Sequence, residues 1–370
     1  MKIAFVVKIN FSSIISTTYH INILKFFSKH HKITILTNAD SYLKKQGIDA
    51  DYVHIPSFTF PNISRLLIND NITNLKLKNI DYDMLVIWYD SLIFFNQKKP
   101  VFRFVDICPY QTFERFIKGD KKRIKWNLFF KIYLKSFKKS SFILTISPQM
   151  KQFLIEYGIS KEKVQWLPHG VDLERFKIKP ETKKTKEFIL ISPVQFLPNR
   201  GSDLIIKSME KLSALDKNIK FISLGNGDKE FKKWNSTIKD MKLDNHIFLK
   251  GIVDNKEMPK YLSNAHVGVS LLEINEYYNK SPPQKIFEYM AMGLPTIAND
   301  IPTHTDYIKD GYNGFIINSA EDLVEAVLKL KNDQKLYKKI SDNAKESAKR
   351  YDIKTVEIKL KEYIDNIEKV

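Results

Sequence analysis

The sequence predicts an α/β protein made of two doubly wound domains, and three observations support this prediction. Short apolar runs alternate along the chain with segments of helical periodicity, which is the pattern of parallel strands covered by helices on both faces. The chain has 370 residues, which suits two ordinary domains better than one. A polar, charged stretch at residues 177–186 separates two series of apolar runs and is typical of an interdomain linker.

The two series of apolar runs give the expected strands. The first series places strands at residues 3–7, 32–37, 84–88, 101–105 and 142–146. The second places strands at residues 188–191, 220–224, 247–249, 267–270, 296–298 and 315–317. These series predict an N-terminal domain over residues 1–176 and a C-terminal domain over residues 185–352. In doubly wound sheets ligands bind at the carboxyl ends of the strands, so the loops after the strands are where functional residues are expected.

Composition narrows the class of protein. A hydrophobic content of 43% excludes a disordered chain, and a formal charge of +18 predicts an anionic partner such as nucleic acid, an acidic membrane surface or a phosphate-bearing ligand. The single cysteine, Cys108, rules out an intramolecular disulfide, and no zinc-type cluster of Cys and His is present.

The first residues lack the long apolar stretch of a signal peptide. The apolar run at 85–95 contains Asp90 and falls short of the ~20 residues that span a bilayer. We therefore expect a cytoplasmic protein, with peripheral contact at the inner face of the cell membrane left open.

The sharpest motif is SPPQKIFEYMAMGLPTIA at residues 281–298. Pro282 and the proline after it are expected to open a helix, because proline is tolerated in a first turn whose N–H groups remain free to face a phosphate. Lys285 places a positive charge at the same end, and Glu288, one turn further on, is placed to accept hydrogen bonds from sugar hydroxyls such as those of a ribose. Gly293 is expected to end the helix. The alternative is an ordinary helix start with Glu288 on an exposed face.

This motif resembles the donor-binding motif of the GT-B retaining glycosyltransferases of family 4. Further segments resemble the same family in the right order: VQWLPHGVDLERF at residues 164–176, LGNG at 224–227, FLKG at 248–251 and GYNGF at 311–315. Each segment alone is weak, but their order over about half of the chain is specific. The resemblance implies a GT-B fold, in which two Rossmann-like domains face each other across a cleft and the C-terminal one holds a nucleotide sugar. It also implies that the final helix, within residues 353–370, returns to the N-terminal domain; the pattern at 335–370 indicates two helices broken near Tyr351.

The resemblance assigns donor-binding roles to particular residues. Glu288 matches the glutamate that binds the donor ribose, and Arg200 matches the basic residue that contacts the diphosphate. Gln195 stands where the family commonly has an arginine, which leaves more of the phosphate charge to Arg200 and Lys285. Lys280 stands where many members carry a second glutamate that meets the transferred sugar, so a change in sugar contacts is expected.

Backbone features complete the implied donor site. Gly225 and Gly227 form the Gly-x-Gly turn after a strand, and Ser281 with Pro282 belongs to the loop of the main motif. The resemblance implies neither a metal ion nor a cofactor, because basic side chains and helix N-termini meet the charge of the diphosphate. Lys285 and Arg200 would stabilise the departing diphosphate, while the acceptor oxygen arrives on the same face of the sugar.

The N-terminal half carries weaker candidates. Asp106, at the carboxyl end of an expected strand, resembles the family position where a His or Asp lines the catalytic cleft; a capping role is the alternative. Residues 10–20 match the acceptor-side loop in position, with Ser16 and Thr17 where a glycine pair is usual, and with His20 as a further candidate. The implied acceptor is a glycan or a lipid-linked molecule.

A basic, aromatic helix is expected at residues 118–139. One stripe carries the aromatic residues Trp126, Phe129, Phe130, Tyr133 and Phe137, and the opposite side carries Lys121, Lys131, Lys135, Lys138 and Lys139. The stripe either packs on the N-terminal sheet or dips into an anionic membrane interface. No nucleic-acid-binding module is present, so nucleic acid is not an expected partner. Two alternatives keep the fold: a nucleotide-sugar epimerase or sugar phosphorylase, and a donor-binding protein without turnover.

Overall fold

The computed structural model of the protein describes residues 1–8, 18–56, 63–88, 91–96, 98–105, 122–177, 186–225 and 227–368. The chain divides into two compact units. The N-terminal unit comprises Met1–Pro168 together with Glu357–Val370, and the C-terminal unit comprises His169–Val356. Within the described part, no helix is both long and apolar enough to cross a membrane.

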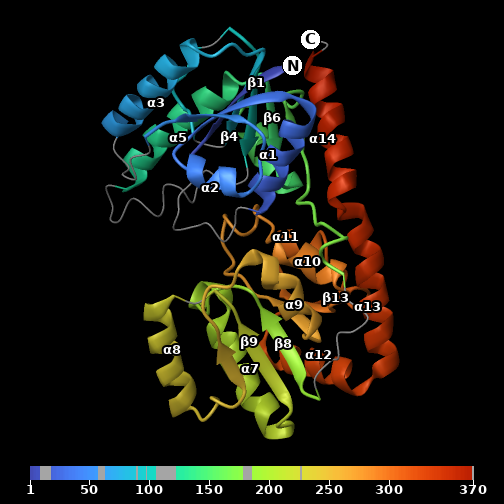
Figure 1. Ribbon diagram of the computed structural model, residues 1–370. Coiled ribbons are helices and arrows are strands. Elements are labelled where there is room, and N and C mark those ends of the chain that lie inside the picture. Colours follow the sequence, from blue (N-terminus) through green and yellow to red (C-terminus); the bar gives the residue numbers. More distant parts are fainter. Residues whose placement is uncertain are drawn as a thin grey trace. The chain divides into compact units, whose positions relative to one another are not determined.

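A parallel seven-stranded sheet is the centre of the N-terminal unit (Figure 1). Its strands stand in the order β3-β2-β1-β4-β5-β6-β7, and every pairing is parallel. Their bounds are β1 Lys2–Val7, β2 Lys32–Thr37, β3 Asp51–His54, β4 Met84–Trp88, β5 Val101–Val105, β6 Phe142–Thr145 and β7 Val164–Trp166. The chain reverses its direction of travel across the sheet between β1 and β4, which is the topological switch point of this unit.

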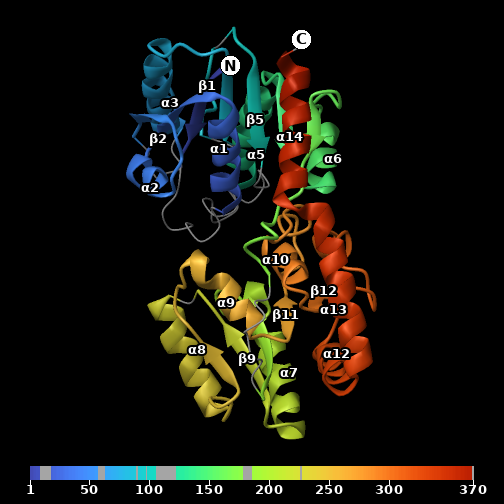
Figure 2. The ribbon, with the colours of Figure 1, turned by 45° about the vertical axis from the view of Figure 1, so that its right-hand side comes forward.

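Helices cover both faces of this sheet. They are α1 Thr18–His30, α2 Asp40–Lys45, α3 Ile63–Lys78, α5 Lys122–Lys138, α6 Pro148–Glu156 and the C-terminal part of α14 Ile353–Glu368. Side chains alternate along β1: the ring of Phe5 meets Phe27 of α1 at 5.4 Å, whereas Ala4 and Val6 join the cluster that contains Leu77 of α3. Figure 2 shows the helices α1 and α3 beside this sheet. Burial on both faces is the reason that the strands read as unbroken apolar runs.

The helix α5 packs its described aromatic residues into the N-terminal unit. Phe130, Tyr133 and Phe137 are buried, while the lysines of the opposite side that the structure describes are exposed: Lys131, Lys135, Lys138 and Lys139. The ring of Phe137 lies 5.1 Å from the guanidinium of Arg103, a fully buried residue of β5 whose Nη2 donates to the carbonyl of Leu92 at 3.1 Å. The described part of the stripe is therefore core, as the packing alternative predicts. The side chains of Trp126 and Phe129, together with Lys121, lie outside the described residues.

The C-terminal unit is built on a parallel six-stranded sheet of order β10-β9-β8-β11-β12-β13. Its strands are β8 Phe188–Ser192, β9 Ile219–Ser223, β10 Ile247–Leu249, β11 Val267–Ser270, β12 Thr296–Asn299 and β13 Gly314–Ile317. Its helices are α7 Ser202–Leu215, α8 Asp228–Asp240, α9 Met258–Ser263, α10 Lys285–Ala291, α11 Pro302–Thr305, α12 Ala320–Asn332 and α13 Gln334–Ala348. The order reverses between β8 and β11, so the switch point of this unit lies where these two strands end.

Two apolar clusters, one on each face, hold this sheet between its helices. Along β8, Leu190 joins the cluster that contains Met209 of α7, whereas Ile189 and Ile191 join the cluster that contains Ile286 of α10. The alternation places α7 and α10 on opposite faces of β8. The short helix α10 is thereby fixed against the carboxyl half of the sheet.

The segment 169–176 clusters with the C-terminal unit, although the sequence places it at the end of the N-terminal domain. Backbone contacts explain this difference. Val171 donates its N–H to the carbonyl of Tyr351 at 2.8 Å and accepts one from Ile353 at 2.9 Å. A Cβ atom on Gly170 would lie 2.6 Å from Cδ1 of Ile353 and 3.2 Å from its Cα, so a larger residue would require the start of α14 to shift. The break expected near Tyr351 is confirmed, because a 3₁₀ turn at Lys349–Tyr351 separates α13 from α14.

Candidate functional site

Lys285 lies at the switch point of the C-terminal unit, between the ends of β8 and β11. Its Nζ donates to Oγ of Ser192 and to the carbonyl of Val269, each at 3.2 Å. Ser192 is the last residue of β8 and Val269 the last but one of the neighbouring strand β11, so the first residue of α10 joins the carboxyl ends of both strands. We call Lys285, Ser192, Val269 and the neighbouring residues Arg200 and Glu288 the switch-point site.

Burial changes the charge properties of Lys285. The residue is 5% exposed, and this burial holds the pKa of its amine well below the usual range, with the nearby charge of Arg200 lowering it further. The sequence predicts a positive charge at the start of a helix. The structure instead places this amine inside the protein, among neutral oxygen atoms.

The ring of Tyr289 fills the space beneath the site. Its hydroxyl lies 3.2 Å from the carbonyl oxygen of Ile191 and 3.1 Å from that of Val269, which joins the same two strands a second time. A Cβ atom on Gly268 would lie 2.4 Å from this ring. Glycine in the middle of β11 therefore lets α10 approach the sheet closely, which a larger residue would prevent.

A buried histidine adjoins the site from α11. Nδ1 of His304 lies 2.9 Å from the carbonyl oxygen of Asn299, and Nε2 lies 2.8 Å from Oγ of Ser270. A carbonyl can only accept, so Nδ1 carries the proton and Nε2 accepts the hydroxyl of Ser270. Burial lowers the pKa of His304 to about 3, although the hydrogen bond to the carbonyl of Asn299 acts in the opposite direction. His304 is therefore a neutral hydrogen-bonding group at neutral pH.

Arg200 reaches the site from the loop after β8. It ends the 3₁₀ turn Pro198–Arg200, and its guanidinium lies 5.0 Å from the centre of the Tyr278 ring. Gly201 follows with φ at 77°, and a Cβ atom there would lie 2.4 Å from Cβ of Leu271. The turn that places Arg200 thus requires glycine at the next position, because both the backbone conformation and the space exclude a side chain.

The other residues predicted after β8 and β9 also come together. The N–H of Gly225 donates to the carbonyl of Gly251 at 2.9 Å, and a Cβ atom on Gly225, whose φ is 87°, would lie 4.0 Å from the backbone nitrogen of Gln195. Gln195 is exposed. Gly227 precedes α8 with an ordinary φ of −79°. At Gly225, the backbone near the ends of β8 and β9 therefore carries no side chain.

Glu288 is buried, with 7% of its surface exposed, so the alternative of a carboxylate on an exposed helix face is wrong. Burial raises its pKa to about 7, and the charge of Arg175 acts in the opposite direction. The carboxylate of Asp172 accepts the N–H groups of Glu174 and Arg175, each at 3.0 Å, and this turn orients Arg175. The segment 169–176 therefore supplies the cation that faces Glu288, a role that the sequence analysis missed.

The loop before α10 contains buried polar atoms without a hydrogen-bond partner. Among the residues that the structure describes, neither Oγ of Ser281 nor Oε1 of Gln284 has one. The amide nitrogen of Gln284 is engaged, because it donates to the carbonyl of Gly170 at 2.9 Å. Pro282 is buried in the same loop. Buried polar atoms that lack partners are uncommon, and here they lie next to the switch-point site.

Two expectations for this loop need correction or closer description. The first-turn amides of α10 are not all free: the N–H groups of Ile286 and Phe287 donate to the carbonyls of Pro283 and Gln284, at 3.3 and 3.2 Å. The expectation that the prolines stand in the first turn needs correction as well, because α10 begins at Lys285, after Gln284, and the proline pair precedes it. Lys280 forms an ion pair with Glu276 across one helical turn.

The candidates of the N-terminal half fall mostly outside the described residues. This holds for Ser16, Thr17 and Asp106, and for the side chain of His20. At the switch point of this unit, the N–H of Lys8 donates to Oγ of Ser91 at 2.9 Å, which joins the chain after β1 to the chain after β4. Nζ of Lys8 lies 3.3 Å from the buried carboxylate of Asp70.

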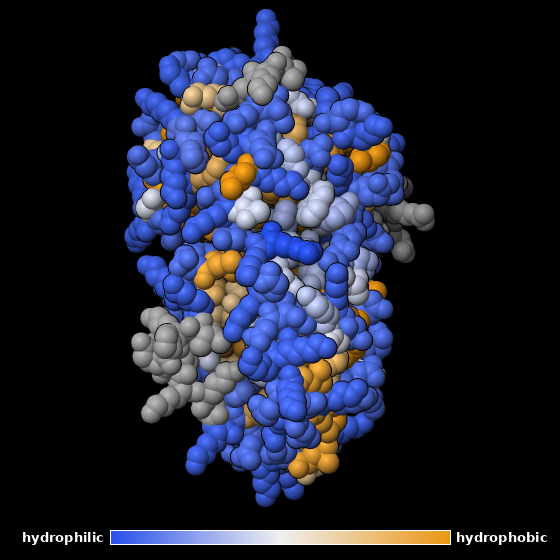
Figure 3. All heavy atoms as spheres, turned by 90° about the vertical axis from the view of Figure 1, so that its right-hand side faces the viewer, coloured by the Kyte–Doolittle hydropathy of each residue, from blue (hydrophilic) through white to orange (hydrophobic). Residues whose placement is uncertain are grey.

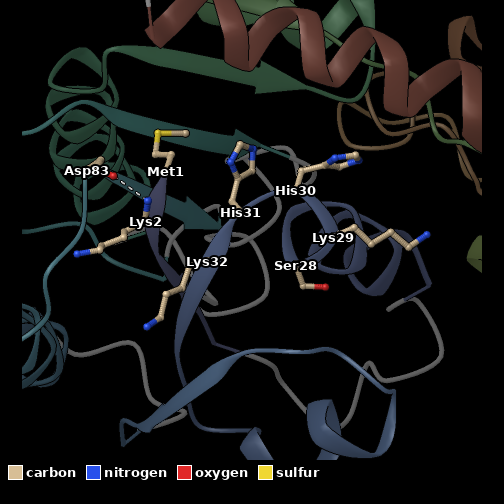
Figure 4. A pocket seen from close by; sticks show the side chains of 8 residues that line it. All are labelled: Met1, Lys2, Ser28, Lys29, His30, His31, Lys32 and Asp83. Atoms are coloured by element: carbon tan, nitrogen blue, oxygen red, sulfur yellow. Dashed lines mark hydrogen bonds between the residues drawn. The ribbon is translucent and has the colours of Figure 1, made fainter.

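A hollow of about 520 Å³, lined mainly by basic residues, lies at the end of the N-terminal sheet where its strands begin. Its lining residues are Met1, Lys2, Ser28, Lys29, His30, His31, Lys32 and Asp83. Lys2, Lys29 and Lys32 point in different directions rather than toward a common centre (Figure 4). The hollow lies at the amino ends of β1 and β2, whereas ligands of doubly wound sheets bind at the carboxyl ends. The switch-point site of the C-terminal unit is therefore the better candidate.

Comparisons with known proteins cover both halves of the chain. The model of the family described as Glycosyltransferase Family 4 matches residues 17–175, and that of Glycosyl transferases group 1 matches residues 174–347. Chitobiosyldiphosphodolichol beta-mannosyltransferase of Candida albicans is 24% identical over 229 residues, which are 56% of this chain and 50% of that protein. An uncharacterised glycosyltransferase of Methanocaldococcus jannaschii is 23% identical over 308 residues, which are 79% of this chain and 76% of that protein.

A solved structure has the same fold over nearly the whole chain. It is that of HepE of Anabaena in complex with UDP-glucose, with a TM-score of 0.76 at 14% identity, covering 99% of this chain and 100% of that one. At this identity the likeness concerns the fold alone, and it agrees with two Rossmann-like parallel sheets. The two family models together span residues 17–347 and meet at the segment that orients Arg175. The chain therefore belongs to the family 4 glycosyltransferases of the GT-B type.

Proposed function

We propose that this protein transfers a hexose-type sugar from a nucleoside-diphosphate sugar to a glycan or lipid-linked acceptor, with retention and without a metal ion. The observation that carries the proposal is the switch-point site itself. The side chains of Lys285 and Arg200 lie close enough for the charge of Arg200 to act on the amine of Lys285, and the buried carboxyl group of Glu288 lies one helical turn away. A nucleoside diphosphate offers the matching chemistry, namely two phosphates and a ribose with hydroxyl donors.

Each group of the site has a distinct role in this proposal. Arg200 and Lys285 bind the diphosphate and stabilise it as it leaves, because negative charge grows there in the transition state. Glu288 accepts hydrogen bonds from the ribose, and Gly225, with Gln195 beside it, lets the nucleotide approach the backbone. Ser281 supplies a hydroxyl that lacks a partner in the free protein. On the sequence resemblance alone, Asp106 stabilises positive charge on the sugar.

Relatives support the donor and acceptor classes. The HepE structure contains UDP-glucose, and the name of the Candida relative describes a mannosyltransferase with a lipid-linked acceptor. Among the described residues, no group of three or more His, Cys, Asp and Glu gathers to hold a metal ion. The proposal assigns the charge of the diphosphate to the side chains of Arg200 and Lys285.

Calorimetric titration with UDP, GDP, ADP and CMP tests the donor site. We expect one nucleoside diphosphate to bind, and Glu288→Ala to weaken its binding by tenfold or more, because a buried hydrogen-bonding acceptor is lost. Glu325→Ala is the matched control, since Glu325 is an exposed residue of α12 paired with Lys329, and its affinity should equal that of the wild type. Binding that is unaffected by Glu288→Ala contradicts the assigned site.

Turnover is then measured with the sugar nucleotide of the base that binds. Acceptor-dependent release of the diphosphate distinguishes a transferase from an epimerase. Unchanged activity in excess chelator is expected for metal-independent transfer, and the anomeric configuration of the product, read by NMR, decides between retention and inversion.

Contact with an anionic membrane is proposed for the lysine side of α5. Lys131, Lys135 and Lys138 are exposed there, on the opposite side from the buried aromatic residues. The molecular face drawn in Figure 3 is mostly hydrophilic, with separate hydrophobic patches. Because the exposed side chains named on α5 are lysines, we expect salt-sensitive, electrostatic binding to vesicles that contain phosphatidylserine. Equal sedimentation with neutral and anionic vesicles would contradict this proposal.

A further inference from the structure

The side chain of Lys285 is buried in the free protein without a counter-ion. Its Nζ donates to a hydroxyl and to a carbonyl, both neutral, and no carboxylate among the described residues acts on its charge. An ammonium group has three N–H donors and a neutral amine has two. The two acceptors therefore satisfy both N–H donors of a neutral amine, whereas an ammonium would leave one buried donor unpaired and a buried charge uncompensated.

The groups that face Lys285 from other elements do not supply the missing charge. Arg200, from the turn after β8, is itself a cation and disfavours a second one. His304, from α11, is kept neutral by its burial, which lowers its pKa to about 3. Charge balance at Lys285 must therefore come from outside this set of residues.

The groups on α10 itself do not supply it either. The hydroxyl of Tyr289 donates to backbone carbonyls, and burial keeps the pKa of this phenol well above its usual range, so it stays neutral. The carboxyl of Glu288 has a pKa near 7 and is influenced by Arg175 rather than by Lys285. In the free protein, the amine of Lys285 can therefore take up one more proton, and the ammonium so formed lacks an acceptor for its third N–H.

We propose that Lys285 takes up a proton when the nucleoside-diphosphate donor binds, and that the diphosphate is the counter-ion which this amine lacks in the free protein. The inference rests on the proposed function, because it requires the diphosphate at the switch-point site. The proton comes from solvent on binding and returns to solvent when the nucleoside diphosphate leaves, so no proton is consumed over a full cycle at this residue.

This linkage has a consequence for catalysis and release. The ammonium formed on binding donates its third N–H to a phosphate oxygen and stabilises the charge that develops as the sugar departs. Loss of that proton weakens the attraction for the product diphosphate. A rise in pH therefore lowers donor affinity, by up to tenfold per pH unit in the range where the free amine is neutral and the bound one is charged.

The test is calorimetric titration of the full chain with UDP, or with whichever nucleoside diphosphate binds, at about pH 8 in two buffers of different ionisation enthalpy. At about this pH the free nucleotide is fully ionised and His304 stays neutral, so proton uptake reports on Lys285. We expect uptake of about one proton per bound nucleotide in the wild type and none in Lys285→Met. Lys207→Met, which removes an exposed lysine of α7, is the matched control and should retain the uptake.

The outcomes separate this inference from the proposed function. Tight binding without proton uptake in the wild type, at constant affinity between about pH 7.5 and 9, overturns the inference and leaves the donor site intact. Failure of every nucleoside diphosphate to bind overturns the proposed function and the inference with it. If Lys285→Met does not fold, the measurement of proton uptake by the wild-type protein still tests the inference.

Discussion

Glu288 and Lys285 lie three residues apart in α10 and are both buried ionisable groups. Neither burial stabilises the fold, because transfer of a charge out of water is unfavourable unless a partner compensates it. Folding proceeds nonetheless because the surrounding apolar clusters are large. Buried ionisable groups that lower the stability of the helix they belong to are typical of a binding site in which the ligand supplies the missing partners.

The ionisation of Glu288 makes stability depend on pH in a direction opposite to that of a paired carboxylate. Its pKa is raised from 4.5 to about 7 in the folded state, so between these values the folded chain binds more protons than the unfolded one. The contribution of Glu288 to the free energy of unfolding therefore falls as pH rises from about 4.5 to 7. It reaches a loss of roughly 3 kcal/mol above that window, at about 1.4 kcal/mol per pKa unit.

Glu288→Gln is expected to raise the melting temperature of the unliganded protein at about pH 8 and to leave it unchanged at about pH 4.5. Thermal unfolding followed by circular dichroism at both pH values measures this. Glu325→Gln, at an exposed carboxylate, should show no such pH-dependent gain. A Glu288→Gln variant that is less stable than the wild type at about pH 8 would show that its carboxylate is stabilised rather than strained by its surroundings.

The short helix α10 owes its position to close approach rather than to its own length. It has seven residues, so packing rather than helix propensity holds it. Gly293, with φ at 62°, ends it, as the sequence predicts, and Gly268 of β11 lets Tyr289 lie flat against the sheet. The position of Lys285 therefore depends on the absence of a Cβ atom on the neighbouring strand.

Gly268→Ala tests this dependence. The new Cβ would lie 2.4 Å from the ring of Tyr289, so we expect a loss of about 1–3 kcal/mol in the free energy of unfolding, together with weaker nucleotide binding. Gly311→Ala is the control: its φ is 66° and no atom lies within 4 Å of the new Cβ, so it should cost only about 1 kcal/mol of backbone strain and leave affinity unchanged. Urea unfolding and calorimetry measure the two effects. Equal affinities for both variants would show that α10 tolerates displacement.

The division of the molecule into two units predicts where a nucleotide acts. All the described residues to which we assign donor contacts belong to the unit His169–Val356. A ligand that binds only the folded form stabilises the part that it contacts, by about 2.7 kcal/mol at a concentration of 100 times Kd. We expect hydrogen exchange in the presence of UDP to slow chiefly at α10 and at the ends of β8 and β11. Protection confined to the N-terminal unit would contradict the assignment.

The fold was predictable from sequence wherever strands are buried on both faces. The strands β2, β4, β5, β10 and β11 begin and end at the predicted residues. Two strands were missed, β3 and β7, which form the two edges of the N-terminal sheet. In sequence, β3 (DYVH) and β7 (VQW) both contain polar residues, so neither forms a continuous apolar run. The edge strand β10 also has only three residues, but its sequence, IFL, is wholly apolar and could be detected.

The sequence by itself determined the two series of strands, the family, and the candidates Arg200, Lys285 and Glu288, because each depends on residue order along the chain. Only the tertiary structure decided the charge state and the partners of those candidates. No local pattern predicted the parts played by Arg175, His304 and Ser270, because these residues lie in segments of the chain other than α10. Protonation depends on burial and on the charges nearby, and these exist only after the strand ends, the proline loop and the segment 169–176 have folded together.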